Sequence, residues 1–273
     1  MKRFAAVLLV LVCVAAGVVR WLDVINYTDP ATGFVTYGPA WARYAVAAGV
    51  LALAALGSLL APRRPAALCG QSAPQGLVCW LCAVGFAALA GARLAGWASL
   101  DGMALAQTVL CLVSAVWFFL LGTSRFTPDF ETPTRSALWG VAGTLSLYLL
   151  TVCRFGLEPT GMARVGENFE ALAALAALLF CTAQAKVAYL PGGRSGGWVF
   201  FTGLAAFLFC GCLALPGALA GWFTGQLALA DLLEAAAVAL VGLVGAVYAL
   251  GAAGPAAPEP AAPARQEENV KSL

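Results

Sequence analysis

Three arginines stand at the ends of long apolar runs, at positions 20, 93 and 154 of the chain. A guanidinium group donates paired hydrogen bonds to carboxylate or phosphate oxygens, so arginines that converge would suit an anionic solute. The alternative is that each side chain extends to the membrane interface and pairs with an acid nearby in the sequence. Those acids are Asp23, Asp101 and Glu158.

Two carboxylates lie near the start of the last apolar run. Asp231 and Glu234 are three residues apart, so they share one face of a helix. A charged side chain at the centre of a membrane costs about 2.5–3.5 kcal/mol, less near the interface, so this face needs a wet or protein-lined environment. The pattern indicates a cation or proton site with an arginine as counter-charge, or a structural ion pair. The candidate ligand-binding or coupling residues are therefore Arg93, Arg154, Asp231, Glu234 and Arg20.

Other chemistry has little support in the sequence. Histidine is absent, which removes the usual general base and His-ligated metals and haem. Among nine cysteines, Cys79 and Cys82 form a C-x-x-C that Cys69 could extend to a soft-metal site, but buried cysteine as a small apolar filler explains them as well. No H-E-x-x-H motif is present. We expect no catalytic residues, no metal and no cofactor, and hence no enzyme.

The amino-acid composition indicates the class of protein in which these residues must be positioned. The chain has 273 residues, of which 62% are hydrophobic and 10% charged, against about 45–50% and about 25% in soluble domains. Its net charge of +2, without a basic cluster, excludes nucleic acid as a partner. The sequence therefore predicts an all-α polytopic membrane protein whose surroundings are the lipid bilayer.

We expect about eight transmembrane spans, because about twenty apolar residues cross a bilayer. An even number places both termini on one side, and positive charge in short loops favours the cytoplasmic side. Lysine and arginine number ten on the N-terminal side and five on the other, so both termini are predicted to be cytoplasmic. The first apolar run also has features of a signal peptide, so the sequence does not decide whether this run is cleaved or is retained as a span. The predicted spans are 4–19, 42–60, 77–94, 103–121, 137–153, 171–190, 198–215 and 228–250.

Two segments outside the spans have their own character. Residues 24–28 and 34–37 are β-branched and aromatic and flank Asp29-Pro30-Ala31-Thr32-Gly33, which predicts a small extracytoplasmic β-hairpin. Residues 254–273 combine proline, alanine and charges, so we expect a disordered cytoplasmic tail.

The loop after the first predicted span resembles that of other membrane proteins. An Arg-x-x-Asp that ends the first span, followed by Asp-Pro-Ala-Thr-Gly-Phe, resembles uncharacterised polytopic membrane proteins of anaerobic Gram-positive bacteria. The resemblance covers about thirty residues and implies a bacterial cytoplasmic membrane. It implies no activity.

These observations predict a small-solute transporter or substrate-capturing membrane subunit, with a polar site in the outer half of the bundle. The solute expected at the arginines is a small anion. The alternative is a non-catalytic scaffold or accessory subunit that docks a membrane-protein partner. That alternative predicts an apolar groove lined by small residues and no polar cavity.

Overall fold

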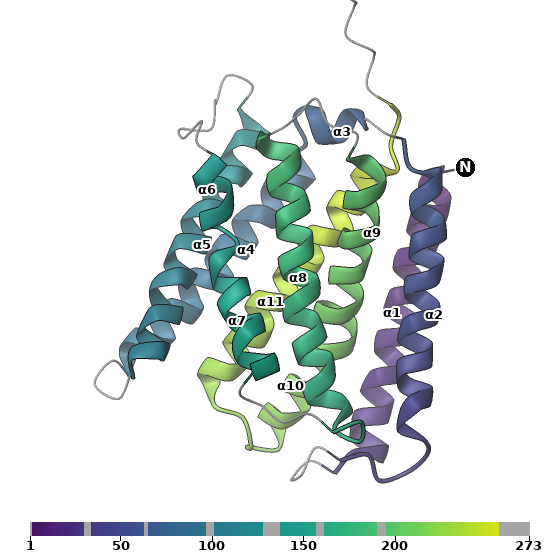
Figure 1. The fold of residues 1–273 in the computed structure, drawn as a ribbon, viewed down its shortest axis with the longest axis vertical. Coiled ribbons are helices and arrows are strands. Elements are labelled where there is room, and N and C mark those ends of the chain that lie inside the picture. Colours follow the sequence, from purple (N-terminus) through teal and green to yellow (C-terminus); the bar gives the residue numbers. More distant parts are fainter. Residues whose placement is uncertain are drawn as a thin grey trace, which may run out of the picture.

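In the computed structural model the chain is a bundle of helices, shown in Figure 1. The structure describes residues 2–29, 34–62, 65–96, 101–127, 137–156, 161–189 and 195–256. Within these residues, seven helices are long and apolar enough to cross a membrane, which is consistent with a multi-pass membrane protein. Six are α1 (Lys2–Tyr27), α2 (Ala40–Leu60), α4 (Ala73–Ala95), α5 (Gly102–Phe126), α8 (Val165–Tyr189) and α11 (Leu229–Ala252).

The remaining long helix, 196–223, changes its winding along its length. It begins as α9 (Gly196–Ala206), continues as the π-helix η2 (Phe207–Ala214) and ends as α10 (Leu215–Phe223). Pro216 lies in the first turn of α10 and has no N–H to donate to the turn before it. A π-helical turn is wider than an α-helical one and often marks a functional site.

The predicted span 137–153 is not one helix. It is divided into α6 (Ala137–Ala142) and α7 (Leu145–Gly156), so the prediction of eight uninterrupted spans is wrong at this position. The reason is the packing of the two residues between them. A Cβ added to Gly143 would lie 2.2 Å from the ring of Trp117 in α5, and the Gly143 carbonyl accepts a hydrogen bond of 3.1 Å from Ser114. This carbonyl therefore finds its partner in α5, and the chain turns before α7 begins.

The predicted β-hairpin after the first span is also wrong in its first strand. Residues 24–27 continue α1, where Arg20 binds Asp23 three residues on and Asn26 donates to the Leu22 carbonyl. The described part of the loop has one antiparallel bridge, between Thr28 and Val35, and no strand. Residues 30–33, which carry the predicted turn, lie outside the described residues.

The two ends of the described chain lie together, at what we call the proximal end of the bundle (Figure 1). Ala256 forms a β-bridge with Pro65, next to the short helix α3 (Ala66–Cys69), and the Arg3 guanidinium lies close to Gly254. The first three residues of the predicted tail, 254–256, are thus paired with the bundle, and the rest of that tail lies outside the described residues.

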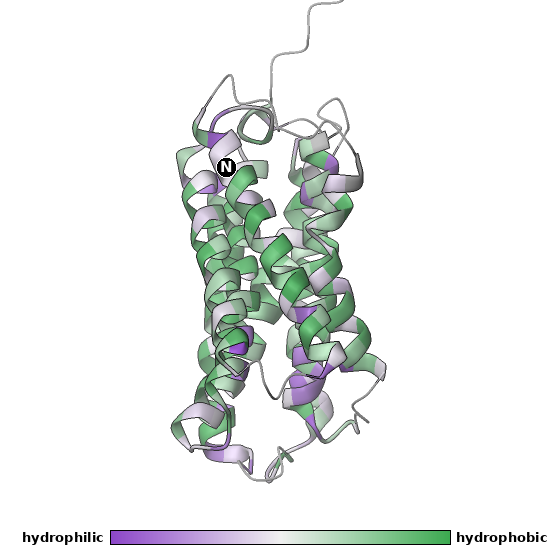
Figure 2. Ribbon diagram, turned by 90° about the vertical axis from the view of Figure 1, so that its left-hand side faces the viewer, coloured by the Kyte–Doolittle hydropathy of each residue, from purple (hydrophilic) through white to green (hydrophobic). Residues whose placement is uncertain are grey.

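The core is built around α11, which packs on α4, α8, α9 and η2. Glycines let these helices approach closely: a Cβ on Gly245 would lie 2.5 Å from the Gly203 carbonyl oxygen of α9. Close contact of small residues is what holds helices together in a membrane, where hydrocarbon surrounds the bundle. Figure 2 shows apolar residues along the helices, with hydrophilic ones at the ends and within the half away from the N-terminus, the distal half.

Candidate functional site

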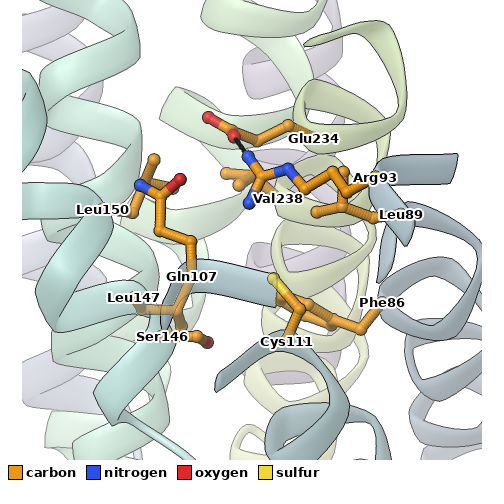
Figure 3. A pocket seen from close by; sticks show the side chains of 10 residues that line it. All are labelled: Phe86, Leu89, Arg93, Gln107, Cys111, Ser146, Leu147, Leu150, Glu234 and Val238. Carbon is orange, nitrogen blue, oxygen red and sulfur yellow. Dashed lines mark hydrogen bonds and ion pairs between the residues drawn. The ribbon is translucent and has the colours of Figure 1, made fainter. Parts of the chain in front are cut away.

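Glu234, in the second turn of α11, joins two other helices through its two carboxylate oxygens. The Arg93 guanidinium of α4 points at Oε2 and hydrogen-bonds to it, as Figure 3 shows. Arg154 of α7 lies 3.2 Å from Oε1. The side chains are only 12% exposed for Glu234 and 14% for Arg93, against 25% for Arg154. One buried carboxylate therefore pairs with two guanidinium groups and ties α4, α7 and α11 together.

Arg154 extends this arrangement to α8, where its Nη1 lies 3.0 Å from the Glu170 carboxylate. We call the series Arg93, Glu234, Arg154 and Glu170 the charged chain. Its arginines are in the last turns of α4 and α7, whereas its glutamates are in the first two turns of α8 and α11. Because a helix favours cations at its C-terminus and anions at its N-terminus, each group occupies the end that its charge prefers.

Two cavities adjoin Glu234, and both lie between helices. The smaller has a volume of about 20 Å³ and lies among α4, α5, α7 and α11 (Figure 3). Gln107, Cys111 and Ser146 give it polar or polarisable walls. Since a water molecule needs roughly 10–15 Å³ of such space, this cavity has room for about one.

The larger cavity has a volume of about 300 Å³ and lies on the other side of Glu234, among α7, α8, η2, α10 and α11. Its walls include Cys210 and Ala214 of the π-helix and Leu150 of α7. Its charged lining consists of Arg154, Glu170, Asp231 and Glu234. A volume of this size falls at the lower end of the range for small-molecule sites.

Asp231 differs from the other acids of this cavity. It lies one helical turn before Glu234, is exposed, and has no hydrogen bond or ion pair within the part of the chain that the structure describes. The lining therefore carries one arginine and three carboxylates, an excess of negative charge. Such an environment is suited to a cation.

Arg20 belongs to a different cluster. Its Nη1 donates a hydrogen bond of 2.6 Å to Asp23, and the guanidinium stacks on the Phe169 ring at 5.3 Å from its centroid. Asp23 also accepts 2.9 Å hydrogen bonds from Nε of Arg43 on α2, a partner that no motif in the sequence singles out.

The sequence-local partners expected for the other two arginines are not their partners in the structure. Arg93 binds Glu234, and Asp101 instead caps α5 by accepting from the Ala104 N–H at 2.7 Å. Glu158, the acid expected beside Arg154, lies outside the described residues. Of the five candidate residues, the structure brings together Arg93, Arg154, Asp231 and Glu234, and it places Arg20 apart from them.

A second polar cluster, near the proximal end, is one that sequence reasoning misses. The Arg125 guanidinium of α5 donates to the Leu68 carbonyl at 3.0 Å and lies over the Tyr248 ring. The Tyr248 hydroxyl lies 3.9 Å from Cys79 Sγ, to which Gln184 also donates. In the sequence Arg125 counts only as a charge that orients the chain, and Tyr248 lies in a uniformly apolar run.

The two polar clusters are far apart. Glu234 and Tyr248 are fourteen residues apart on α11, which is about 21 Å at 1.5 Å per residue. Between them α11 presents Val241 and Val244, both fully buried. Among the described residues, the distal cavities are therefore separated from the proximal cluster by packed apolar side chains.

The C-x-x-C pair points into this packed interior. Cys79 and Cys82 are both fully buried, and the side chain of Cys69 is not described. In the described ranges, no three side chains of His, Cys, Asp or Glu gather as metal ligands would. Cys79 is instead a hydrogen-bonding neighbour of Tyr248 and Gln184.

Comparison with known proteins gives no relative for this arrangement. No protein-family model, curated protein or solved structure matches the chain. The resemblance noted in the first loop therefore stays a prediction.

Proposed function

We propose that the chain is a small-solute transporter or substrate-capturing membrane subunit whose solute binds in the cavity beside Asp231 and Glu234. The observation that carries this proposal is the cavity itself, about 300 Å³ in volume and lined by one arginine and three carboxylates from α7, α8 and α11. A purely structural ion pair needs no such space. The scaffold alternative predicts an apolar groove without a polar cavity, so this cavity favours solute binding.

The charges favour a cation over the anion expected from the sequence. Arg93 and Arg154 are already bound to glutamates, so an anion would have to displace Glu234 or Glu170. Asp231 is exposed to the cavity and has no partner among the described residues. The solute we propose is a small cation, such as a protonated amine, with Asp231 as its first ligand.

Two irregular elements adjoin the cavity and support movement around it. Leu150 belongs to α7, the second half of a broken helix, and Cys210 belongs to the π-helix. Interrupted helices line the solute sites of many transporters. We propose that the break at Gly143 and the π-helix absorb the rearrangement that would connect the site to the proximal end.

Thermal unfolding of the detergent-purified protein tests the proposal. A ligand that binds only the folded state raises its stability, by about 2.7 kcal/mol at a hundred times its dissociation constant. The panel pairs small organic amines with carboxylates of similar size. We expect an amine to raise the melting temperature of the wild type and of Glu167→Gln, whose carboxylate lies outside this cavity, but not of Asp231→Asn.

Two outcomes contradict the proposal. The first is that no amine in the panel shifts the melting temperature of the wild type. The second is that the Asp231→Asn variant shifts as much as the wild type, which would place the ligand away from this cavity.

A further inference from the structure

An apolar groove lies on the other face of the π-helix, between α1, η2 and α11. Its volume is about 710 Å³. The groove follows α1 from the middle of this helix to its distal end, and α1 is long and apolar enough to span a membrane. Its walls include Val14, Gly17, Phe207, Gly211, Ala239 and Leu243.

A polar pocket of about 450 Å³ adjoins the distal end of this groove, and Trp21 lines both. It lies where α1, α8 and α10 have their distal ends, the level at which tryptophan prefers to sit between membrane and water. Its polar side chains include Arg20, Thr28, Asp29, Glu167, Glu170 and Thr224. An apolar groove that leads to a polar pocket at the interface has the two parts of a lipid site.

We propose that the groove and the pocket together bind one zwitterionic phospholipid of the phosphatidylethanolamine type. Its acyl chain lies along the groove and its headgroup enters the pocket. The phosphate binds Arg20, which is 4% exposed and whose Nε is buried without a hydrogen-bond partner although Nη1 binds Asp23. A guanidinium N–H and a phosphate oxygen form a strong charge-assisted hydrogen bond.

The ammonium group binds on α8. Glu167 and Glu170 are one helical turn apart and line the pocket, with side chains 30% and 31% exposed. Both side chains line the pocket although each carboxylate is also paired with an arginine, Arg164 and Arg154 respectively. An ammonium group supplies three donors for these oxygens.

The lining also decides between lipid classes. Arg20 and two glutamates, Glu167 and Glu170, line the pocket, so a zwitterionic headgroup finds partners for its phosphate and for its ammonium group, whereas an anionic headgroup finds a partner for its phosphate alone. The acyl chain moves from hydrocarbon into an equally apolar groove and contributes little preference. Selectivity therefore comes from the headgroup. A helix of a partner protein or of a second copy would fill the groove and leave the polar pocket empty.

Native mass spectrometry of the detergent-purified protein tests this site. The protein is mixed with equal amounts of phosphatidylethanolamine and phosphatidylglycerol that have identical acyl chains. Hydrogen bonds to charged groups are each worth about a factor of ten or more, so we expect phosphatidylethanolamine to be retained about tenfold over phosphatidylglycerol. Glu167→Gln and Arg20→Gln should each reduce this preference severalfold. In Arg20→Gln, Asp23 still accepts a hydrogen bond from Arg43, so this carboxylate keeps a partner.

Gly211→Leu tests the groove, because a Cβ at Gly211 would lie 3.6 Å from the Phe207 ring and fits without a clash. The leucine then occupies the space of the acyl chain and should remove the bound lipid. Gly49→Leu is the matched control, since this glycine of α2 is exposed and faces open space.

Equal retention of the two lipids, or unchanged retention in Gly211→Leu, would overturn the proposal. A dimer that Gly211→Leu dissociates would overturn it as well, by making a second copy the occupant. The Asp231→Asn variant, whose carboxylate lines the other cavity, should retain the lipid as the wild type does. Failure of the solute site therefore leaves the lipid site standing, and the reverse also holds.

Discussion

Replacing Glu234 by glutamine should destabilise the protein strongly, because one buried carboxylate pairs with two guanidinium groups. The substitution keeps the shape of the side chain but removes its charge. Arg154 would retain Glu170 at 3.0 Å, whereas Arg93 has no other acidic partner in the part of the chain that the structure describes. Removing one member of a buried ion pair costs about 3–5 kcal/mol.

The expected loss is about 3 kcal/mol, the lower end of that range, because one of the two arginines keeps a partner. For a chain of this size each kcal/mol lowers the melting temperature by about 2–4 °C, so Glu234→Gln should melt about 6–12 °C below the wild type. Tryptophan fluorescence of the purified protein follows the transition, since the chain has eight tryptophans.

Asp231→Asn is the matched control, one turn away on the same helix. Its carboxylate is exposed and has no partner among the described residues, so its loss should change stability by less than about 0.5 kcal/mol. If Glu234→Gln and Asp231→Asn melt at the same temperature, the buried charged chain does not stabilise the bundle and the reasoning from its geometry is refuted.

Two further predictions concern packing. Gly143→Ala should lower the free energy of chemical unfolding by about 1–3 kcal/mol, because its Cβ would lie 2.2 Å from the Trp117 ring. Gly156→Ala is the control and should be tolerated, since a Cβ at Gly156 faces open space. Equal stability of the two variants would contradict the packing at the helix break. Cys79 is fully buried, whereas Cys153 is only partly buried. A thiol reagent should therefore label Cys153 first and reach Cys79 only when the protein unfolds. Rapid labelling of Cys79 in the folded protein would contradict the closed packing of the interior.

Much of the bundle could be predicted because a membrane makes strong demands on sequence. Seven of the eight predicted spans coincide with helices long and apolar enough to cross it. The meeting of Arg93 and Arg154 with Glu234 could also be anticipated, since all three lie at distal helix ends and charges in hydrocarbon need partners. Glu170 was a weaker candidate, because an acid in the first turns of a helix is already favourable there.

The irregular parts could not be predicted, because their causes are contacts between distant segments. The break in the fifth predicted span depends on Trp117 and Ser114 of another helix. The π-helix lies in a run that is apolar throughout, so periodicity gives no sign of it. The supposed first strand of the hairpin is helical because β-branched residues follow a helix that has no reason to stop.

The proximal cluster shows a further limit of the sequence. Gln75 is almost fully buried, and its amide has no hydrogen-bond partner in the described structure. It lies just before the predicted span 77–94, a position where the sequence alone places a glutamine in water. Only the arrangement in space shows that Gln75 lies against Gly251 of α11.

The most direct test of the charged chain is a double-mutant cycle between Arg93→Gln and Glu234→Gln, measured by unfolding of the purified protein. Residues in one buried ion-pair network couple by about 0.5–3 kcal/mol, whereas independent residues are additive within about 0.3–0.5 kcal/mol. The geometry predicts a coupling of more than about 1 kcal/mol for this pair and additivity for Arg93→Gln with Asp231→Asn. Additivity in both cycles would contradict the central role assigned to Glu234.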